Sequence, residues 1–351
     1  MPAISILATL AMAQSASMAS ADAAPAVSVK LVRELMGIRP LAFAPAATGS
    51  LVAVTLENRT VRIIDAKTSQ TVKTFEGHPQ PAYAVAWSDD GSFLATGDES
   101  ARIFVWDTRT GKKIQTIYGD HQRGIQKLSF NHARNLLIST GKDDKIDVWS
   151  IPTGKKVGQI LGQGSNLYGG VFNPLTDMFV AATLTPNGRI YRQTSAGPKV
   201  VGFLTSVDPQ GAVDICWNKQ GTMIMTGEKS GNAVIFDAKK MKKLGTLKGH
   251  TDWVTSVAFS PNGKVAATGS SDRTVRLWEP KSLKQLALIE NQSGVGSPVA
   301  FTADGKYLVT VGVSDYMQIY SLNPAQADAT KAPTKAPAKK TTKKTTKKRG
   351  G

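Results

Sequence analysis

The residues best suited to chemistry in this chain are four histidines, His78, His121, His132 and His250, and a single cysteine, Cys216. A metal site or a Ser-His-Asp arrangement needs imidazoles, thiolates or carboxylates that converge on one point. The histidines are spread through the chain without the close spacing of a metal site. We therefore expect no metal ion and no cofactor.

Short motifs for common enzyme mechanisms are also missing from the sequence. There is no G-x-x-x-x-G-K-[ST] phosphate loop and no G-x-S-x-G turn for a nucleophilic serine. Asp89-Asp90-Gly91 and Asp143-Asp144 resemble fragments of cation-binding loops, but both fall where turns between strands are expected. Cys216 lies in an apolar run and is expected to be a buried apolar side chain. The prediction is a protein that is not an enzyme.

Large apolar residues recur along the chain with a period that indicates a repeat architecture. One series is Phe43, Trp87, Phe130, Phe172, Trp217, Phe259 and Phe301, and the other is Ile64, Trp106, Trp149, Tyr191, Phe236, Trp278 and Tyr320. The gaps lie between 42 and 45 residues in both series. This period is typical of four-stranded propeller blades, so seven similar sheets are predicted.

The sixth repeat shows how one sheet would be built. Short β-rich runs around Val257, Val265 and Val275, and another from Leu283 to Leu288, are separated by polar turns. Four such strands form an antiparallel meander that cannot cover its own two faces. Stacking the sheets around an axis buries both faces. The predicted fold is an all-β, seven-bladed β-propeller of four-stranded antiparallel sheets.

The repeat resembles that of the WD-repeat family, whose unit opens with Gly-His and closes near Trp-Asp. Gly77-His78 and Gly249-His250 match the opening pair, and Trp106-Asp107 and Trp278-Glu279 match the closing pair. The resemblance covers roughly residues 27–322 and is weakest in the fourth unit. It implies a monomeric, non-enzymatic scaffold that binds a peptide or a protein.

In that family a hydrogen-bonded set of His, Ser or Thr, Asp and Trp ties the strands of a blade together. The resemblance implies that the structural residues are His78, Thr96, Trp106, His121, Trp149, His250, Thr268, Asp272 and Trp278. The second unit has Ser100 at the Asp position, and the third leaves Ser139 or Thr140 and Asp143 or Asp144 open. A buried polar group without a partner costs about 1–3 kcal/mol, so these residues are expected to act in stability.

The seventh unit reaches Asn323-Pro324 after only three strands. An alternating apolar run over residues 27–35 can supply the fourth strand. We therefore expect this N-terminal strand to join the last blade and close the ring. The expected organisation is a leader over residues 1–26, a propeller over 27–322 and a tail over 323–351.

The resemblance also implies a partner-binding face at one end of the central channel. The family positions lie three and five residues after the Gly-His histidine, at the start of each innermost strand. Carried through the repeats, the implied partner-binding residues are Arg39, Tyr83, Gln126, Tyr168, Trp253, Thr255 and Ser297. Aromatic and Arg side chains often dominate interfaces, although local packing at a blade end is the alternative role for each aromatic residue.

Residues 1–26 resemble a secretory signal peptide, with an apolar stretch over residues 4–13 and small residues suited to cleavage after it. No Lys or Arg precedes Lys30, which departs from that pattern. We favour export to the periplasm or outside the cell over an intracellular location. A disordered Ala-rich leader and an organelle transit segment are the alternatives. No apolar run reaches the 18 or so residues that span a bilayer.

Residues 331–351 contain eight Lys, one Arg and no Asp or Glu, within a formal net charge of +17 for the chain. Without large apolar residues this tail is expected to be disordered. A flexible polycation binds polyanions such as nucleic acid, anionic lipid or a cell-wall polymer. The polyanion-binding residues would be Lys339, Lys340, Lys343, Lys344, Lys347, Lys348 and Arg349. Attachment mainly through this tail is the alternative function, and a solubilising role is the simpler alternative.

Overall fold

Short β-rich runs, mostly of five or six residues and separated by turns, form strands throughout the computed structural model. The structure describes residues 27–324 apart from 120, 123, 142, 163–166, 184–186, 206–210 and 295–297, and the side chains of 167, 168, 183, 187 and 324 are also outside it. Residues Val27–Asn323 form one compact unit. The leader and the Lys-rich tail lie outside the described residues, so their predicted roles stay predictions.

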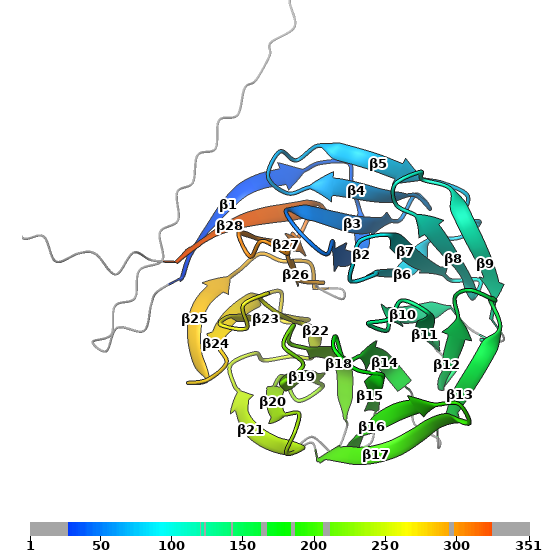
Figure 1. The fold of residues 1–351 in the computed structure, drawn as a ribbon. Coiled ribbons are helices and arrows are strands. Elements are labelled where there is room, and N and C mark those ends of the chain that lie inside the picture. Colours follow the sequence, from blue (N-terminus) through cyan, green and yellow to red (C-terminus); the bar gives the residue numbers. More distant parts are fainter. Residues whose placement is uncertain are drawn as a thin grey trace, which may run out of the picture. The chain divides into compact units, whose positions relative to one another are not determined.

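Seven four-stranded antiparallel sheets stand around a common axis, as predicted (Figure 1). Blade 1 contains β2 (Pro40–Pro45), β3 (Leu51–Leu56), β4 (Val61–Asp65) and β5 (Thr71–Phe75). Blade 2 contains β6 (Ala82–Trp87), β7 (Phe93–Asp98), β8 (Arg102–Asp107) and β9 (Lys113–Tyr118). Blade 3 contains β10 (Ile125–Phe130), β11 (Leu136–Gly141), β12 (Lys145–Ser150) and β13 (Lys156–Leu161).

The next three blades repeat this order from the axis outward. Blade 4 contains β14 (Leu167–Phe172), β15 (Met178–Thr183), β16 (Asn187–Thr194) and β17 (Gly197–Thr205). Blade 5 contains β18 (Ala212–Trp217), β19 (Met223–Glu228), β20 (Ala233–Asp237) and β21 (Lys242–Leu247). Blade 6 contains β22 (Val254–Phe259), β23 (Ala266–Ser270), β24 (Val275–Glu279) and β25 (Lys284–Ile289).

Blade 7 is assembled from both ends of the compact unit. It contains β26 (Ala300–Phe301), β27 (Tyr307–Val311) and β28 (Met317–Pro324), and its outermost strand is β1 (Val27–Leu35). The Gln318 amide of β28 donates a 3.0 Å hydrogen bond to Glu34 of β1. The predicted closure by the N-terminal strand is therefore confirmed.

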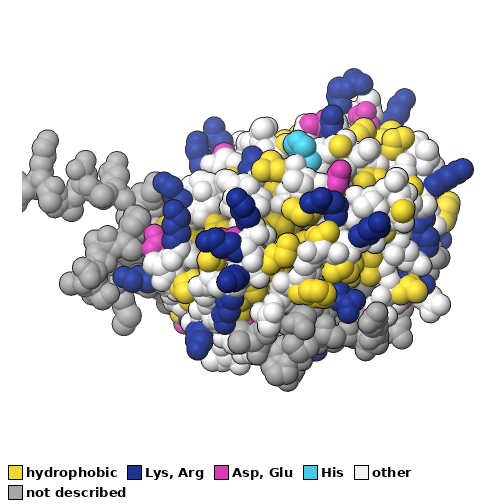
Figure 2. All heavy atoms as spheres, turned by 60° about the horizontal axis from the view of Figure 1, so that its bottom comes forward, with side chains coloured by type: hydrophobic (Ala, Val, Ile, Leu, Met, Phe, Trp, Pro, Cys, Tyr) yellow, Lys and Arg dark blue, Asp and Glu magenta, His cyan; other side chains and the backbone are white. Residues whose placement is uncertain are grey.

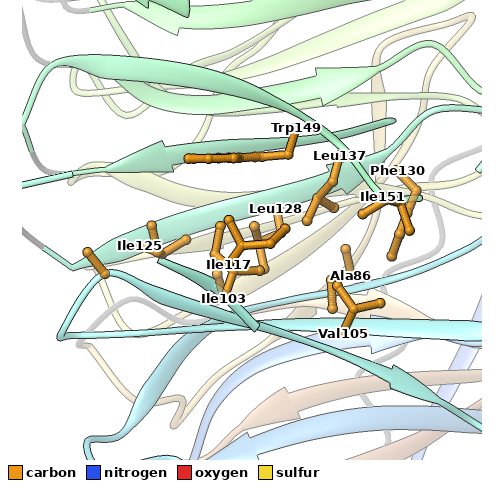
Figure 3. Packing of buried hydrophobic residues seen from close by; sticks show 13 residues of the cluster. Ala86, Ile103, Val105, Ile117, Ile125, Leu128, Phe130, Leu137, Trp149 and Ile151 are labelled. Atoms are coloured by element: carbon orange, nitrogen blue, oxygen red, sulfur yellow. The ribbon is translucent and has the colours of Figure 1, made fainter. Parts of the chain in front are cut away.

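The hydrophobic core consists of seven clusters, and each lies between two neighbouring blades. Between blades 2 and 3, for example, Ile103 and Ile117 pack on the Ile125, Leu137 and Trp149 side of the next sheet (Figure 3). A blade therefore buries its two faces only when both neighbours are present. The apolar period in the sequence reflects this, because each repeat supplies half of two interfaces.

The outer strands pack against turns of the next blade, and at four of these contacts a glycine on one side faces a long side chain on the other. In two interfaces the turn residue is glycine and the outer strand supplies a long side chain, in the pairs Gly111 with Lys73 and Gly154 with Gln115. The reverse holds where Gly202 meets Met241 and Gly245 meets Leu283, since a Cβ on either glycine would overlap the side chain opposite. Met241 and Leu283 have positive φ angles of 54° and 62°, which L-residues rarely adopt. At these two turns a residue in a sparsely populated conformation therefore packs on a glycine of the preceding blade.

Candidate functional site

Buried hydrogen-bonded sets join the strands within three blades. In blade 6 the Trp278 indole donates to the Thr268 hydroxyl at 2.8 Å, and that hydroxyl lies 2.7 Å from His250 Nε2. His250 Nδ1 lies 2.9 Å from the Asp272 carboxylate. A single direction of donation satisfies all four groups: the indole donates to Thr268, Thr268 to Nε2, and Nδ1–H to Asp272. The imidazole then carries its proton on Nδ1 and is neutral.

Blade 3 contains the same arrangement, and it resolves the two open positions. Trp149 donates to Ser139 at 2.8 Å, and Ser139 lies 2.8 Å from His121 Nε2. The carboxylate at His121 Nδ1 is that of Asp143, at 2.9 Å. Ser139 and Asp143, rather than Thr140 and Asp144, therefore occupy the set.

Blade 2 departs from the sequence alignment. Ser100 stands at the expected Asp position, but Asp98 reaches His78 Nδ1 from within β7 at 3.0 Å. The other Asp98 oxygen accepts from the backbone N–H groups of Ser100 and Arg102 at 2.9 and 3.0 Å. Thr96 lies 2.6 Å from His78 Nε2 and accepts from Trp106 at 2.8 Å. The carboxylate has moved two residues along the chain while its partners stay the same.

Stability should depend on pH through His250. Burial lowers the pKa of His250 below its ordinary value of 6.5, while Asp272 opposes the shift. As the pH falls below about 6.5, the unfolded chain takes up a proton that the folded chain rejects, so stability is fully present above this pH and declines below it. For this one group the slope is at most about 1.4 kcal/mol per pH unit.

Urea unfolding between about pH 7.5 and 5.5 checks this expectation. The His250→Gln variant, which cannot titrate in this range, should be less stable but show a smaller loss per pH unit than the native chain. Equal slopes in the two proteins would contradict the assignment.

The channel end at which the innermost strands begin brings together several predicted partner-binding residues. In blades 1 to 6 the innermost strand has a β-bulge at its second residue. The bulged residue is Tyr83 in β6, Gln126 in β10 and Thr255 in β22. A bulge redirects the side chain of the extra residue. Tyr83 is 40% exposed, whereas Gln126 and Thr255 are half-buried. All three line a channel cavity of about 760 Å³.

Two further predicted residues, Arg39 and Trp253, immediately precede the innermost strands β2 and β22, and neither lines the channel cavity. The Trp253 side chain is 41% exposed immediately before the buried Val254, and the Lys229 ammonium lies 4.5 Å from its ring centroid. Arg39 is exposed and forms a 3.2 Å ion pair with Glu57. The backbone of Tyr168 occupies the bulge of β14, but its side chain and the whole of Ser297 lie outside the described residues.

An ion pair inside the channel was not anticipated from the sequence. The Lys127 ammonium of blade 3 contacts the Asp214 carboxylate of blade 5 and donates to the Ile215 carbonyl at 2.9 Å. It passes blade 4 at Gly169, where a Cβ would lie 3.1 Å from Lys127 Cδ. No motif marks this pair, since its two residues are 87 positions apart. Only the repeat register places them on facing inner strands.

The remaining candidates for chemistry have ordinary surroundings. Cys216 is partly buried, not fully buried as predicted: it packs against the core between blades 5 and 6 and lines the channel cavity. Desolvation raises the pKa of its thiol, which therefore stays protonated at neutral pH. His132 lies on the surface, 3.2 Å from Asp89. Among the described residues, no three His, Cys, Asp or Glu side chains are grouped so that they could hold a metal ion. The same part of the chain contains no helix that is long and apolar enough to cross a membrane.

Comparison with known proteins agrees with the geometry of the blades. The family model described as WD domain, G-beta repeat matches residues 69–107, 111–150 and 241–279, which cover most of blades 2, 3 and 6. These are the blades that contain the buried histidine sets. The chain is a WD-repeat propeller.

Three curated relatives are similar to parts of this chain. WD repeat-containing protein srw1 of Schizosaccharomyces pombe is 26% identical over 61% of this chain and 38% of its own length. The B-type cell cycle switch protein ccs52A of Medicago truncatula is 27% identical over 62% of this chain and 46% of its own. Cell division cycle 20.1, cofactor of APC complex, of Arabidopsis thaliana is 27% identical over 28% of this chain and 21% of its own. The matched part of this WD-repeat chain thus spans less than half the length of each of these relatives.

Proposed function

We propose that this WD-repeat propeller is a non-enzymatic scaffold that captures a peptide or protein at the channel end bearing Tyr83 and Trp253. The observation that carries the proposal is that two large aromatic side chains remain about 40% exposed where the innermost strands β6 and β22 begin. Their sequence neighbours Ala82 and Val254 are fully buried. Exposed aromatic residues at the rim of a cavity are suited to act as binding anchors.

Charge and shape add to this proposal. Arg39 places an exposed guanidinium just before the innermost strand β2, and Lys229 rests on the Trp253 ring. A partner with an aromatic or aliphatic anchor and a nearby carboxylate would fit these groups. The printed name of one relative describes a cofactor of a protein complex, which supports a protein partner rather than a small substrate.

A double variant, Tyr83→Ala with Trp253→Ala, tests the channel end. Peptides selected from a displayed library on the native full-length chain should bind the variant at least about tenfold more weakly, a loss of about 1.4 kcal/mol. The melting temperature should change little, because both side chains are half in solvent. Fluorescence anisotropy and thermal unfolding measure the two quantities.

The matched control is Tyr118→Ala with Phe203→Ala, which removes two exposed aromatic side chains from the outer strands β9 and β17. It should leave the affinity of the selected peptides unchanged. The proposal fails if this control weakens binding equally. It also fails if the channel-end variant melts early and still binds.

The Lys-rich tail is proposed as a second, independent point of contact with polyanions. Its support is the charge of residues 331–351, which carry eight Lys and one Arg without an acidic residue. Such a segment attracts any polyanion, and salt weakens this attraction strongly. Its contribution is therefore separable from that of the channel end by ionic strength.

A further inference from the structure

The outermost strands of blades 1 to 6 share a feature that the channel-end proposal does not use. Each contains a β-bulge, and an aliphatic side chain occupies it every time: Val72, Ile114, Val157, Val201, Leu244 and Leu286. The first five are 40–57% exposed. Core packing does not account for exposed aliphatic residues that recur at one register position on the rim.

Positive charge surrounds these side chains in four consecutive blades. The turns and outer strands over residues 108–118, 151–161, 193–205 and 238–248, here named the basic belt, contain eleven Lys and Arg and no Asp or Glu. Asp107 and Asp237, which precede two of these segments, accept hydrogen bonds from their own turns at 2.6 and 2.8 Å. Lys156 lies 3.5 Å from Asp147, and Lys113 lies 4.0 Å over the Phe104 ring. The belt itself contains no carboxylate, and Asp147, at Lys156, and Asp107, at Arg109, are acidic groups that face its cations from just outside it.

The belt follows the circumference of the ring. In Figure 1 the strands β9, β13, β17 and β21 succeed one another around the right and lower edge. Figure 2 brings that lower edge forward and shows Lys and Arg side chains interspersed with apolar ones, with few acidic side chains between them. The surface is convex and amphipathic, and the outer edges of these four strands pair with no described strand.

We propose that the basic belt binds an extended, acidic polypeptide segment with apolar residues spaced along it. Such a segment uses all the features of the belt: carboxylates meet the lysines, apolar side chains meet the bulged aliphatic residues, and the backbone can pair with an open strand edge. The strand β17 is the best anchor, because it has nine residues and exposes Val200, Val201 and Phe203.

Two other polyanions use the belt less completely. A single-stranded nucleic acid stacks successive bases on aromatic side chains, whereas all the bulged residues are aliphatic and the two exposed aromatic residues of the belt, Tyr118 and Phe203, lie on separate blades. An anionic bilayer is nearly flat on this scale and would reach only neighbouring blades of a convex rim. A flexible acidic peptide can follow the curve across several blades.

Fluorescence anisotropy with a short synthetic peptide, in which pairs of Glu alternate with single Val or Leu residues, tests the proposal on the full-length chain. Binding to the native protein should weaken as salt is raised from about 50 to 300 mM. The quadruple variant Lys113→Gln, Lys156→Gln, Lys240→Gln and Lys243→Gln should bind at least about tenfold more weakly. The double variant Val201→Ser with Leu244→Ser should also weaken binding, although its charge is unchanged.

Matched controls separate the belt from other cationic and binding surfaces. The variant Lys219→Gln, Lys264→Gln and Lys306→Gln removes exposed lysines from turns elsewhere on the propeller and should bind within about twofold of the native chain. Replacing the tail lysines 339, 340, 343 and 344 by Gln should also have little effect. The channel-end double variant should keep full affinity for the acidic peptide. The belt proposal can therefore be rejected without rejecting the channel-end proposal.

Three results would overturn the belt proposal. One is equal loss of affinity in the control variants, which would indicate general attraction to positive charge. Another is tighter, belt-dependent binding of single-stranded DNA or of anionic vesicles than of the peptide. The third is unchanged peptide binding by the quadruple variant. If that variant also aggregates, the lysines would instead be assigned to protection of the strand edges.

Discussion

Replacing Thr268 by Val should lower the free energy of unfolding by about 2–4 kcal/mol, although the two side chains have nearly the same shape. The Thr268 hydroxyl is the only link between the Trp278 indole and His250 Nε2 in the described hydrogen-bond set of blade 6. Without it, one buried donor and one buried acceptor lose their partner at the same time. No cavity is created, so the measured loss reports the hydrogen bonds alone. Urea unfolding at pH 7.5 measures it.

The propeller provides its own control at two equivalent positions. Thr226 in blade 5 and Thr310 in blade 7 occupy the register position of Thr268, and both are buried. Their hydroxyls have no hydrogen-bond partner among the described residues. Thr226→Val and Thr310→Val should therefore be neutral or slightly stabilising, because they remove a polar atom that gains nothing from burial. A similar loss at all three positions would show that the hydrogen-bond set contributes little to stability.

The architecture of this molecule could be predicted from the sequence alone. The fold followed from spacing, because a blade buries both faces only against its neighbours and so each repeat must keep its large apolar residues in phase. Closure followed from counting strands, since a fourth strand was missing after Tyr320 and available before Ile38. Both inferences depend on periodicity, which a single sequence displays directly.

Details that depend on one side chain reaching another could not be predicted in this way. Asp98 replaces the missing Asp at position 100, because a carboxylate at the end of β7 can reach the same imidazole nitrogen from another direction. Lys127 and Asp214 meet past Gly169, whose missing side chain leaves room for the stem of Lys127. A pattern of residue types at fixed spacing does not predict either contact. The register of the repeats identifies only the strands on which the two residues lie.

Gly245 and Leu283 provide the second large effect that we expect, across the interface between blades 5 and 6. Gly245→Gln alone should destabilise the protein by about 2–3 kcal/mol, because its side chain would occupy the space of the Leu283 side chain. Leu283→Gly alone should cost less. It opens a gap at the interface but relieves the strain of a non-glycine residue at a φ of 62°.

The double variant Gly245→Gln with Leu283→Gly recreates the pair Gln115 and Gly154, which the protein itself uses between blades 2 and 3. It should recover at least about 1 kcal/mol relative to the sum of the two single effects, as measured by urea unfolding of all four proteins in a double-mutant cycle. The reciprocal fit between blades requires this coupling, since each glycine is tolerated only because the neighbouring blade supplies the missing volume. Simple additivity would mean that the turn and the outer strand tolerate their residues independently, and that the size match between blades has no energetic consequence.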